Sequence, residues 1–338
     1  MQKKKKHVRN FLLSFCMIGS FLFEMTITSQ SHHPLPADDW MAEIDGKTKL
    51  SNISLPGTHD SCTQFIGLSY VFRCQNSSIK AQLENGYRYL DIRLALDESN
   101  TDKLILKHNF SKCRRSGSLF SSTLYLDHVV DDVYSFLDHH PSETVIMCMK
   151  NEEPKDDVSQ VKKALFDVIE KKKESWYLSN QIPTMDEVRG KIVLATRIDD
   201  KKDEQDKGLR FFWDDQGDRE VLSVPHKEHA ISDKESVFVQ DRYNYDVSDK
   251  IEAIRHGLTN CKASDKSFYL NFASTSGKGK IGHPVKYAKT INDFLHHYNW
   301  KENTCYGVVI VDFATRKLAE KIYRTNYKFC IKSNISIL

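Results

Sequence analysis

The sequence predicts a single irregular (β/α)8 barrel of the TIM type, which is an α/β fold. Eight short stretches with the pattern of β-strands are mostly separated by stretches in which apolar residues recur at helical spacing. Strands that alternate with helices favour a parallel sheet, and eight of them in about 290 residues fit a barrel. The predicted strands are residues 51–55, 87–94, 104–108, 144–149, 191–196, 236–239, 267–272 and 307–311. No Pro/Ser-rich linker or internal repeat divides them, so residues 31–338 are predicted to form one domain.

The first predicted strand, residues 51–55, is followed by Pro56-Gly57 and then by His59-Asp60. Proline and glycine weaken a strand, so the His-Asp pair is expected just past its carboxyl end. A barrel of this type carries its active site at that end of its strands. A single His-Asp pair after a strand more often lies in a solvated loop. Its interpretation as part of a functional site depends on whether other strands of the chain end in a similar pattern.

Helical spacing of apolar residues predicts helices over residues 78–84, 126–137, 158–169, 285–295 and 317–324. Asn85-Gly86 and Pro141 are typical stop signals after the first two. No helical pattern joins strands 87–94 and 104–108, so the barrel is expected to be irregular. The run 199–206 is almost wholly charged, which predicts an exposed connection.

Polar and charged side chains lie at the ends of seven of the predicted strands. They are His59, Asp60, Asp91, Arg93, His108, Lys150, Glu152, Arg197, Asp241, Tyr243 and Asp312. One such residue is usually just solvated. Seven strand ends that meet at one barrel mouth would form a site.

Residues 1–30 have the layout of a secretory signal peptide, with a basic start at residues 3–9, an apolar run at 11–23 and polar residues after it. The apolar run is shorter than the ~20 residues of a membrane-spanning helix. We therefore expect a secreted protein, with an uncleaved anchor as the alternative. The leader holds five basic residues and one acidic residue, so the formal net charge changes from +3 to −1 without it. That charge gives no indication of a nucleic-acid partner.

Seven cysteines follow the leader: Cys62, Cys74, Cys113, Cys148, Cys261, Cys305 and Cys330. An odd number leaves at least one thiol unpaired within the chain. The sequence contains no Cys-x-x-Cys pair, so a zinc site is not predicted. Cys62 and Cys74 could close a short loop, but spacing alone assigns no disulfide.

Two histidines, several carboxylates and an arginine are the side chains that general acid–base cleavage of a phosphodiester needs. One imidazole takes a proton from the attacking hydroxyl, and the other gives a proton to the leaving oxygen. A carboxylate beside a histidine fixes its tautomer, and a guanidinium binds phosphate oxygens. The residue types alone do not say which histidine is the acid.

The segment Leu-Pro-Gly-Thr-His-Asp-Ser at residues 55–61, followed by Gly-Tyr-Arg-Tyr-Leu-Asp-Ile-Arg at 86–93, resembles the bacterial-type phosphatidylinositol-specific phospholipase C family. Further segments that resemble this family are residues 107–108, 143–152, 190–197, 239–243 and 307–313. The resemblance covers residues 45–325, with an X-domain core at about 45–200. The combination is specific, although no single segment is.

The resemblance implies an enzyme that cleaves phosphatidylinositol to diacylglycerol and inositol 1,2-cyclic phosphate. It implies that His59 is the general base on the inositol 2-hydroxyl, with Asp312 as its orienting partner. His108 would be the general acid, assisted by Asp60. Arg93 would hold the phosphate, with Asp91 beside it. The residues implied to bind inositol are Lys150, Glu152, Arg197, Asp241 and Tyr243, the last by stacking on the ring.

Arg93 also distinguishes two branches of the resemblance. The calcium-dependent eukaryotic relatives carry Asn after the first histidine and an acidic residue at the place of Arg93. This chain has Asp60 and Arg93 there. A guanidinium would replace the cation, so no metal and no cofactor are expected. A remnant metal pair of Asp91 and Glu152 is the alternative.

The implied partner is phosphatidylinositol in a membrane surface, bound transiently by a monomer. Phe65, Ile66, Leu68, Tyr70 and Phe72 either insert into the bilayer or pack as lid and core. The loop 274–280 either meets anionic headgroups or is simply flexible.

Three other functions stay open at this point. They are cleavage of glycosylphosphatidylinositol (GPI) anchors, non-catalytic binding of inositol lipids by the barrel, and metal-dependent cleavage of glycerol or sphingolipid headgroups. The presence of both histidines and Arg93 argues against a binding protein, and Arg93 argues against the metal-dependent enzyme.

Overall fold

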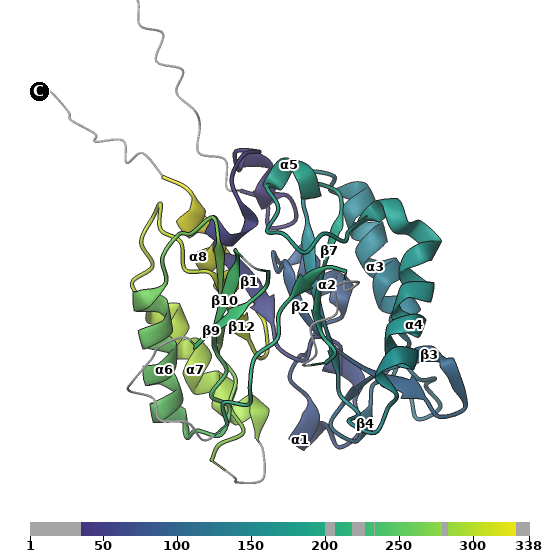
Figure 1. The fold of residues 1–338 in the computed structure, drawn as a ribbon. Helices are drawn as coiled ribbons and strands as arrows, with labels where there is room; N and C mark the ends of the chain where they lie inside the picture. Colours follow the sequence, from purple (N-terminus) through teal and green to yellow (C-terminus); the bar gives the residue numbers. More distant parts are fainter. Residues whose placement is uncertain (1–34, 200–206, 218–226, 233, 279–282, 329–338) are drawn as a thin grey trace, which may run out of the picture. The chain divides into compact units, whose positions relative to one another are not determined.

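The computed structural model describes residues 35–199, 207–217, 227–232, 234–278 and 283–328 (Figure 1). The predicted leader, Cys330 and most of the charged run 199–206 lie outside the described residues, as do residues 279–280 of the loop 274–280. Within the described ranges, no helix combines the length and the apolar character that crossing a bilayer requires.

Parallel strands form the centre of residues 35–328. The sheet runs in the order β6-β7-β5-β2-β1-β12-β11-β10-β9. The strand bounds are β1 Leu55–Thr58, β2 Tyr89–Asp97, β5 Val145–Asn151, β6 Trp176–Tyr177, β7 Ile192–Arg197, β8 Leu209–Arg210, β9 Lys227–Ala230, β10 Ser236–Gln240, β11 Ser267–Phe272 and β12 Val308–Val311. Neighbours from β7 to β10 along this order are all parallel, as expected for strands joined by helical crossovers.

The sheet is irregular at one edge of the barrel. Both β6 and β8 pair with β7, and β9 is antiparallel to β10. Among the described strands, no ladder joins β8 to β9 or β10. The expected irregular α/β barrel is therefore confirmed, with its seam between these strands.

Alternation along the strands separates two layers of core. In β2, Tyr89 packs in the cluster inside the barrel, whereas Leu90 and Ile92 pack against the outer helices. Successive strand residues point to opposite faces, so Asp91 and Arg93 share the inner face with Tyr89. The strand pattern thus places charged side chains directly above the apolar interior.

The outer helices are those that the sequence predicts, with one addition. They are α2 Ile79–Glu84, α3 Leu126–His139, α4 Val158–Ile169, α6 Val247–Asn260, α7 Pro284–His297 and α8 Arg316–Tyr323 (Figure 1). Ser78 caps α2 by accepting the N–H of Ala81. Gly86 ends that helix with φ +102°, a conformation that glycine adopts without strain.

Helix α6 was missed in the sequence. Asp246 caps it by accepting the N–H of Asp249, and Ile254 and Leu258 form part of its buried face. Lys250 interrupts that apolar face, yet it is fully buried. Its Nζ donates to Gln240 Oε1 and the Arg242 carbonyl. These hydrogen bonds explain why a lysine can be buried at this position.

The first strand is placed differently from the prediction. Residues 50–52 form a 3-10 helix, and β1 runs through Pro56 and Gly57. Pro56 needs no N–H toward β2, because the pairing of β1 with β2 starts only at Gly57. A Cβ on Gly57 would lie 3.1 Å from side-chain atoms of Ile310 and Tyr89, so the glycine allows close strand packing. His59 still follows the carboxyl end of the strand.

The third predicted strand is also corrected. β3 (Asn100–His108) is antiparallel to β2 and is not one of the parallel barrel strands. A short turn can join only antiparallel strands, since a parallel pair needs a long crossover. The two-residue β4 (Ser111–Lys112) continues the hairpin. β3 returns the chain toward the barrel mouth and ends at His108.

Candidate active site

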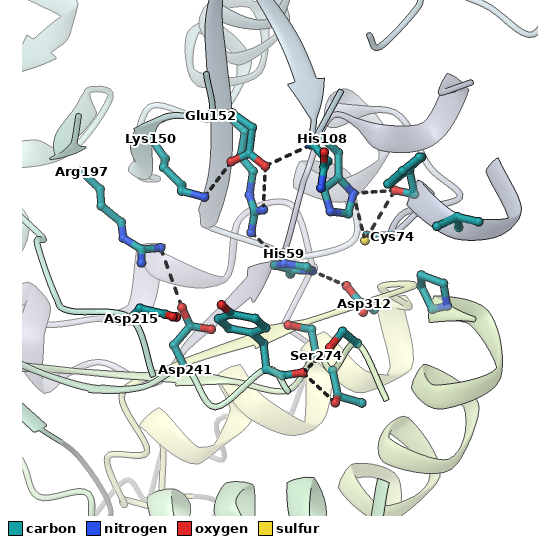
Figure 2. A pocket seen from close by; sticks show the side chains of 18 residues that line it. His59, Cys74, His108, Lys150, Glu152, Arg197, Asp215, Asp241, Ser274 and Asp312 are labelled. Atoms are coloured by element: carbon teal, nitrogen blue, oxygen red, sulfur yellow. Dashed lines mark hydrogen bonds and ion pairs between the residues drawn. The ribbon is translucent and has the colours of Figure 1, made fainter. Parts of the chain in front are cut away.

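The strand ends surround one cavity of about 570 Å³ (Figure 2). Nine of the residues predicted from the sequence line it: His59, Arg93, His108, Lys150, Glu152, Arg197, Asp241, Tyr243 and Asp312. The other two, Asp60 and Asp91, are buried beside it and contact Arg93. The structure therefore brings all eleven predicted residues together.

Strand register explains why three cations lie next to one another at this mouth. Arg93 of β2 is opposite Lys150 of β5, and Lys150 is opposite Arg197 of β7. Parallel strands in register place such residues side by side on one face. Two residues earlier on the same three strands, and so one layer deeper in the barrel, lie Asp91, Cys148 and Ala195. The cations therefore form the upper layer of the barrel interior.

His59 is held by two groups on opposite sides of its ring. Nδ1 lies 2.7 Å from Asp312 Oδ1, and Nε2 lies 2.8 Å from Nη2 of Arg93. Burial lowers the pKa of His59, but the charges of Asp312 and Asp60 outweigh burial and raise it to about 9. Asp312 is itself buried. This pair has the geometry of an oriented base.

His108 is oriented by a backbone carbonyl. Its Nδ1 lies 2.8 Å from the Phe72 carbonyl oxygen, which can only accept, so this nitrogen carries a proton. Its Nε2 lies 3.3 Å from Asp60 Oδ2. Burial raises the pKa of the Asp60 carboxyl against the opposing effect of Arg93 and His108. A carboxyl with a raised pKa shares a proton readily with an imidazole, which suits a general acid.

Arg93 contacts three carboxylates in addition to His59. Its Nε lies 2.9 Å from Asp60 Oδ1, Nη2 lies 3.2 Å from Asp91 Oδ2, and Nη1 lies 3.4 Å from Glu152 Oε1. Burial lowers the pKa of the guanidinium, but these carboxylates outweigh burial and raise it well above its ordinary value. Burial raises the pKa of Asp91, but Arg93, His59 and the Asp60 N–H together outweigh burial and hold the pKa of that carboxyl below its usual range. The side chain is therefore a fixed positive charge at the base of the cavity wall.

The backbone at Asp60 turns sharply to present both members of the His-Asp pair. Asp60 has φ +44°, a left-handed conformation that aspartate adopts more easily than most residues. Its N–H donates to Asp91 Oδ2 at 3.1 Å. This contact joins the loop after β1 to the inner face of β2.

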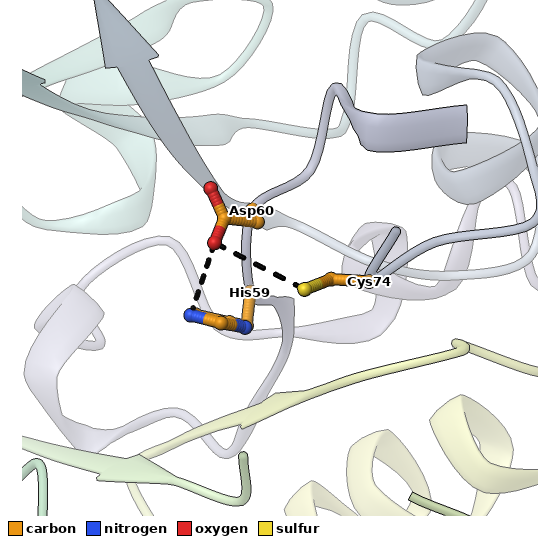
Figure 3. A group of neighbouring side chains, drawn as sticks. All are labelled: His59, Asp60 and Cys74. Carbon is orange, nitrogen blue, oxygen red and sulfur yellow. Dashed lines mark hydrogen bonds and ion pairs between the residues drawn. The ribbon is translucent and has the colours of Figure 1, made fainter. Parts of the chain in front are cut away.

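His59, Asp60 and Cys74 offer a set of metal-ligand atoms within 4.8 Å of one another (Figure 3). The surroundings argue against a cation at this point. Arg93 already contacts both Asp60 and His59, and burial raises the pKa of the Cys74 thiol well above its ordinary value. A metal needs the thiolate and would meet the guanidinium, so these residues fit a packed acid–base pair better than a metal centre.

Four of the remaining predicted residues form two ion pairs that line the cavity (Figure 2). Lys150 Nζ lies 2.6 Å from Glu152 Oε2, and Arg197 Nη1 lies 3.8 Å from Asp241 Oδ2. Tyr243 lines the cavity with 41% of its surface exposed. These groups provide donors, acceptors and a ring face, which a polyhydroxylated ligand requires.

Sequence reasoning missed several residues in the cavity wall and directly behind it. Trp213 lies beneath Arg197, whose guanidinium carbon is 3.6 Å from the ring centroid, and donates to Asp241 Oδ2 at 3.0 Å. Asn109 donates its backbone N–H to Glu152 Oε1. The other lining residues outside the prediction are Val71, Cys74, Asp215, Ser274, Thr275, Ser276 and Pro284. Ser274, Thr275 and Ser276 closely follow β11, but none of them is charged, and the others lie on loops or helix ends for which the sequence carried no signal.

The segment 65–72 divides between the two roles that the sequence left open. Ile66 and Phe72 are buried, and Phe72 lines the cavity. Leu68 and Tyr70 are 64% and 61% exposed. The short helix α1 (Ser69–Phe72) therefore has one side in the cavity wall and one side in solvent.

Comparisons with known proteins identify similar chains. Residues 58–198 match the family described as phosphatidylinositol-specific phospholipase C, X domain. A 1-phosphatidylinositol phosphodiesterase of Listeria monocytogenes is 26% identical over 302 residues, which cover 85% of this chain and 84% of that protein. A protein of the same name from Staphylococcus aureus is 26% identical over 335 residues, which cover 92% and 94% of the two chains.

Solved structures are also similar. The phosphatidylinositol-specific phospholipase C of Listeria monocytogenes is 26% identical with a TM-score of 0.67, over 87% of this chain and 100% of that one. A variant of the Staphylococcus aureus enzyme is 23% identical with a TM-score of 0.71, over 87% and 98% of the chains, and supports the fold alone. The resemblance predicted from the sequence and the barrel fold are both confirmed.

Proposed function

We propose that this chain, which carries the phosphatidylinositol-specific phospholipase C X domain over residues 58–198, cleaves phosphatidylinositol to diacylglycerol and inositol 1,2-cyclic phosphate without a metal ion. One observation carries the proposal. Two separately oriented imidazoles, His59 and His108, lie on either side of Asp60, and a fixed guanidinium contacts the first of them. An attacking hydroxyl, a phosphate and a leaving oxygen need these three groups.

In this proposal His59 is the general base. Asp312 holds Nδ1–H, which leaves Nε2 as the proton acceptor toward the cavity. The inositol 2-hydroxyl loses its proton to Nε2 and attacks the phosphorus. The new O–P bond closes the cyclic phosphate, and the bond from phosphorus to the diacylglycerol oxygen breaks.

His108 would return a proton to the departing oxygen. Its Nδ1–H is fixed on the Phe72 carbonyl, so the transferable proton is on Nε2, beside Asp60. The diacylglycerol thus leaves as an alcohol and not as an alkoxide. Each of these two proton transfers contributes roughly 10²–10⁴-fold to the rate.

Metal independence rests on Arg93. The guanidinium pairs with Asp60, Asp91 and Glu152 and so occupies the place where these carboxylates would bind a calcium ion. The same group would stabilise the charge that develops on the phosphate oxygens. No cofactor is required by the reaction.

Inositol recognition would come from the two ion pairs and the tyrosine. Lys150–Glu152 and Arg197–Asp241 each present a donor next to an acceptor, which matches neighbouring ring hydroxyls. Tyr243 would stack on the apolar face of the ring. Because Trp213 orients Arg197 and Asp241 together, this pair is pre-organised.

The substrate resides in membranes, so we also propose transient docking at a membrane surface, with the exposed Leu68 before α1 and Tyr70 of α1 in contact with lipid. Secretion is part of the same proposal and is supported by the signal-like order of residues 1–30.

The decisive experiment measures inositol phosphate release from phosphatidylinositol vesicles, with excess chelator and then with added calcium, and separates cyclic from acyclic product. We expect cyclic product that chelator does not diminish. Activity that disappears with chelator would contradict the role of Arg93. A protein that binds the vesicles but releases nothing would point to the non-catalytic alternative, and release only from GPI-anchored protein would point to the anchor as substrate.

A further inference from the structure

A second hollow, of about 280 Å³, lies on the other side of α1 from the catalytic cavity. We call it the arginine groove. The residues that define it are Phe65, Ser69, Arg73, Arg114, Ser116 and Ser118. Val71 and Phe72 of the same short helix line the catalytic cavity. The two hollows therefore share α1 as a wall.

The far wall of the groove is a hairpin formed by residues 113–124. Arg114 pairs with Thr123, the Arg115 N–H donates to the Ser122 carbonyl, and the Leu124 N–H donates to the Cys113 carbonyl. The base of the hairpin is fixed to the segment before α1, because the Arg114 N–H donates to the Phe65 carbonyl at 2.7 Å. Figure 1 places α1 and β4, which precedes the hairpin, at the same end of the fold.

The tip of this hairpin exposes two large apolar side chains. Leu119 is 82% exposed and Phe120 is 94% exposed. Leu68, which precedes α1, and Tyr70 of α1 are also exposed, and the Tyr70 hydroxyl lies 2.7 Å from His283 Nε2. Apolar side chains that surround a polar hollow are typical of surfaces that meet a membrane.

The charge inside the groove is uncompensated. Neither Arg73 nor Arg114 forms an ion pair with a carboxylate of the described chain, and the buried Nε of Arg73 has no hydrogen-bond partner among the described residues. Serine hydroxyls lie beside them. Two guanidinium groups with hydroxyl donors are the groups that bind phosphate esters.

We propose that the arginine groove binds the headgroup phosphate of an anionic phospholipid in the bilayer, with Leu119 and Phe120 inserted next to it. The lipid is a second ligand and is not the cleaved substrate. It would hold the α1 side of the catalytic cavity against the membrane. The proposal goes beyond the cleavage reaction and does not depend on it.

The test uses vesicles that contain no inositol lipid, so it is independent of the reaction. Binding of the full chain is compared on phosphatidylcholine alone and on phosphatidylcholine mixed with phosphatidylglycerol. The wild-type protein should prefer the mixed vesicles. The double variant Arg73→Gln/Arg114→Gln should lose roughly tenfold or more of its affinity for them, since each arginine near the surface contributes about a factor of five. Leu119→Ser/Phe120→Ser should lower affinity for both kinds of vesicle.

Arg115→Gln is the matched control. Arg114 and Arg115 both line a further hollow that contains Asp132, but only Arg114 also lines the arginine groove. If Arg115→Gln lowers affinity for the mixed vesicles as much as Arg114→Gln, the attraction is general and the groove proposal is wrong. Equal binding of the wild type and the double variant would overturn it as well.

Soluble inorganic phosphate separates a lipid site from an anion site. Phosphate at the concentration of the vesicle lipid should not displace the protein, because it lacks the membrane contacts of the hairpin. Full displacement by phosphate at constant ionic strength would contradict the proposed lipid. Thermal unfolding should have the same midpoint for the wild type and the double variant, which confirms that the variant is folded without reference to the reaction.

Discussion

Nη2 of Arg93 lies 2.8 Å from Nε2 of His59, so the side chain proposed to hold the phosphate touches the ring proposed to take the proton. A guanidinium can only donate, and this contact therefore requires an unprotonated Nε2. Asp312 and Asp60 act in the opposite direction, because they overcome the effect of burial and raise the pKa of His59 to about 9. A phosphate that draws Arg93 toward itself would leave Nε2 free to accept the hydroxyl proton.

Arg93→Lys should lower kcat on phosphatidylinositol vesicles by roughly 10²–10³-fold, the cost of losing one strong transition-state donor. An ammonium group cannot reproduce the planar fork that contacts Asp60, Asp91 and Glu152 at once. The measurement is kcat at saturating lipid, with thermal unfolding as the control for folding. A kcat equal to that of the wild type would remove Arg93 from the mechanism.

His108→Ala should separate the acid from the base. The variant should lose roughly 10²–10⁴-fold with phosphatidylinositol. With a substrate whose leaving group is a nitrophenol, the loss should be much smaller, because a weakly basic phenolate departs without a proton. His59→Ala should be equally inactive on both substrates, since the attacking hydroxyl still needs its base. The reverse pattern would exchange the two roles.

The His59–Asp312 pair predicts a pH dependence. A base whose pKa is about 9 in the free protein accepts a proton only after it has lost its own, so kcat/KM should rise with pH up to about this value. Asp312→Asn removes a charge that stabilises the imidazolium, so the pKa of His59 falls. The acidic limb of the kcat/KM profile should therefore move to lower pH, while the maximum decreases. An unmoved limb would show that another group sets it.

The residues that meet at the barrel mouth could be predicted because they follow local rules. His59 and Asp312 come directly after buried strands, and the alternation in β2 puts Asp91 and Arg93 on one face. His108 was placed correctly for a partly wrong reason. It was assigned to a parallel strand, whereas the antiparallel hairpin of β2 and β3 brings it to the mouth. The sequence thus predicts where a strand ends even when it does not predict whether that strand is parallel or antiparallel to its neighbour.

Residues that depend on long-range packing could not be predicted. Trp213 reaches Arg197 and Asp241 from an irregular segment, and Cys74 lies beside His108 only because its loop folds back over the mouth. Helix α6 was missed in the sequence for a similar reason. Lys250 interrupts its apolar pattern, and only the tertiary partners Gln240 and Arg242 explain why it is buried.

The two arginines of the motif at residues 86–93 lead to a final, contrasting prediction. Arg88 is fully buried, and its Nη2 and Nε lie 2.7 and 2.8 Å from Glu143 Oε2. Its other N–H groups donate to the carbonyls of Leu83, Tyr87 and Ala37. Arg88→Met leaves the Glu143 carboxylate buried without its cation, so it should lower the free energy of unfolding by about 3–5 kcal/mol. Urea denaturation measures this loss.

The double variant Arg88→Met/Glu143→Leu is the matched control, because it removes both charges. It should recover much of the stability lost in Arg88→Met, since the main cost of the single change is the unpaired charge. The folded fraction of Arg88→Met should keep the kcat of the wild type, whereas Arg93→Lys should keep stability and lose kcat. A loss of kcat in folded Arg88→Met would show that the pair with Glu143 positions the catalytic face of β2 as well as stabilising the fold.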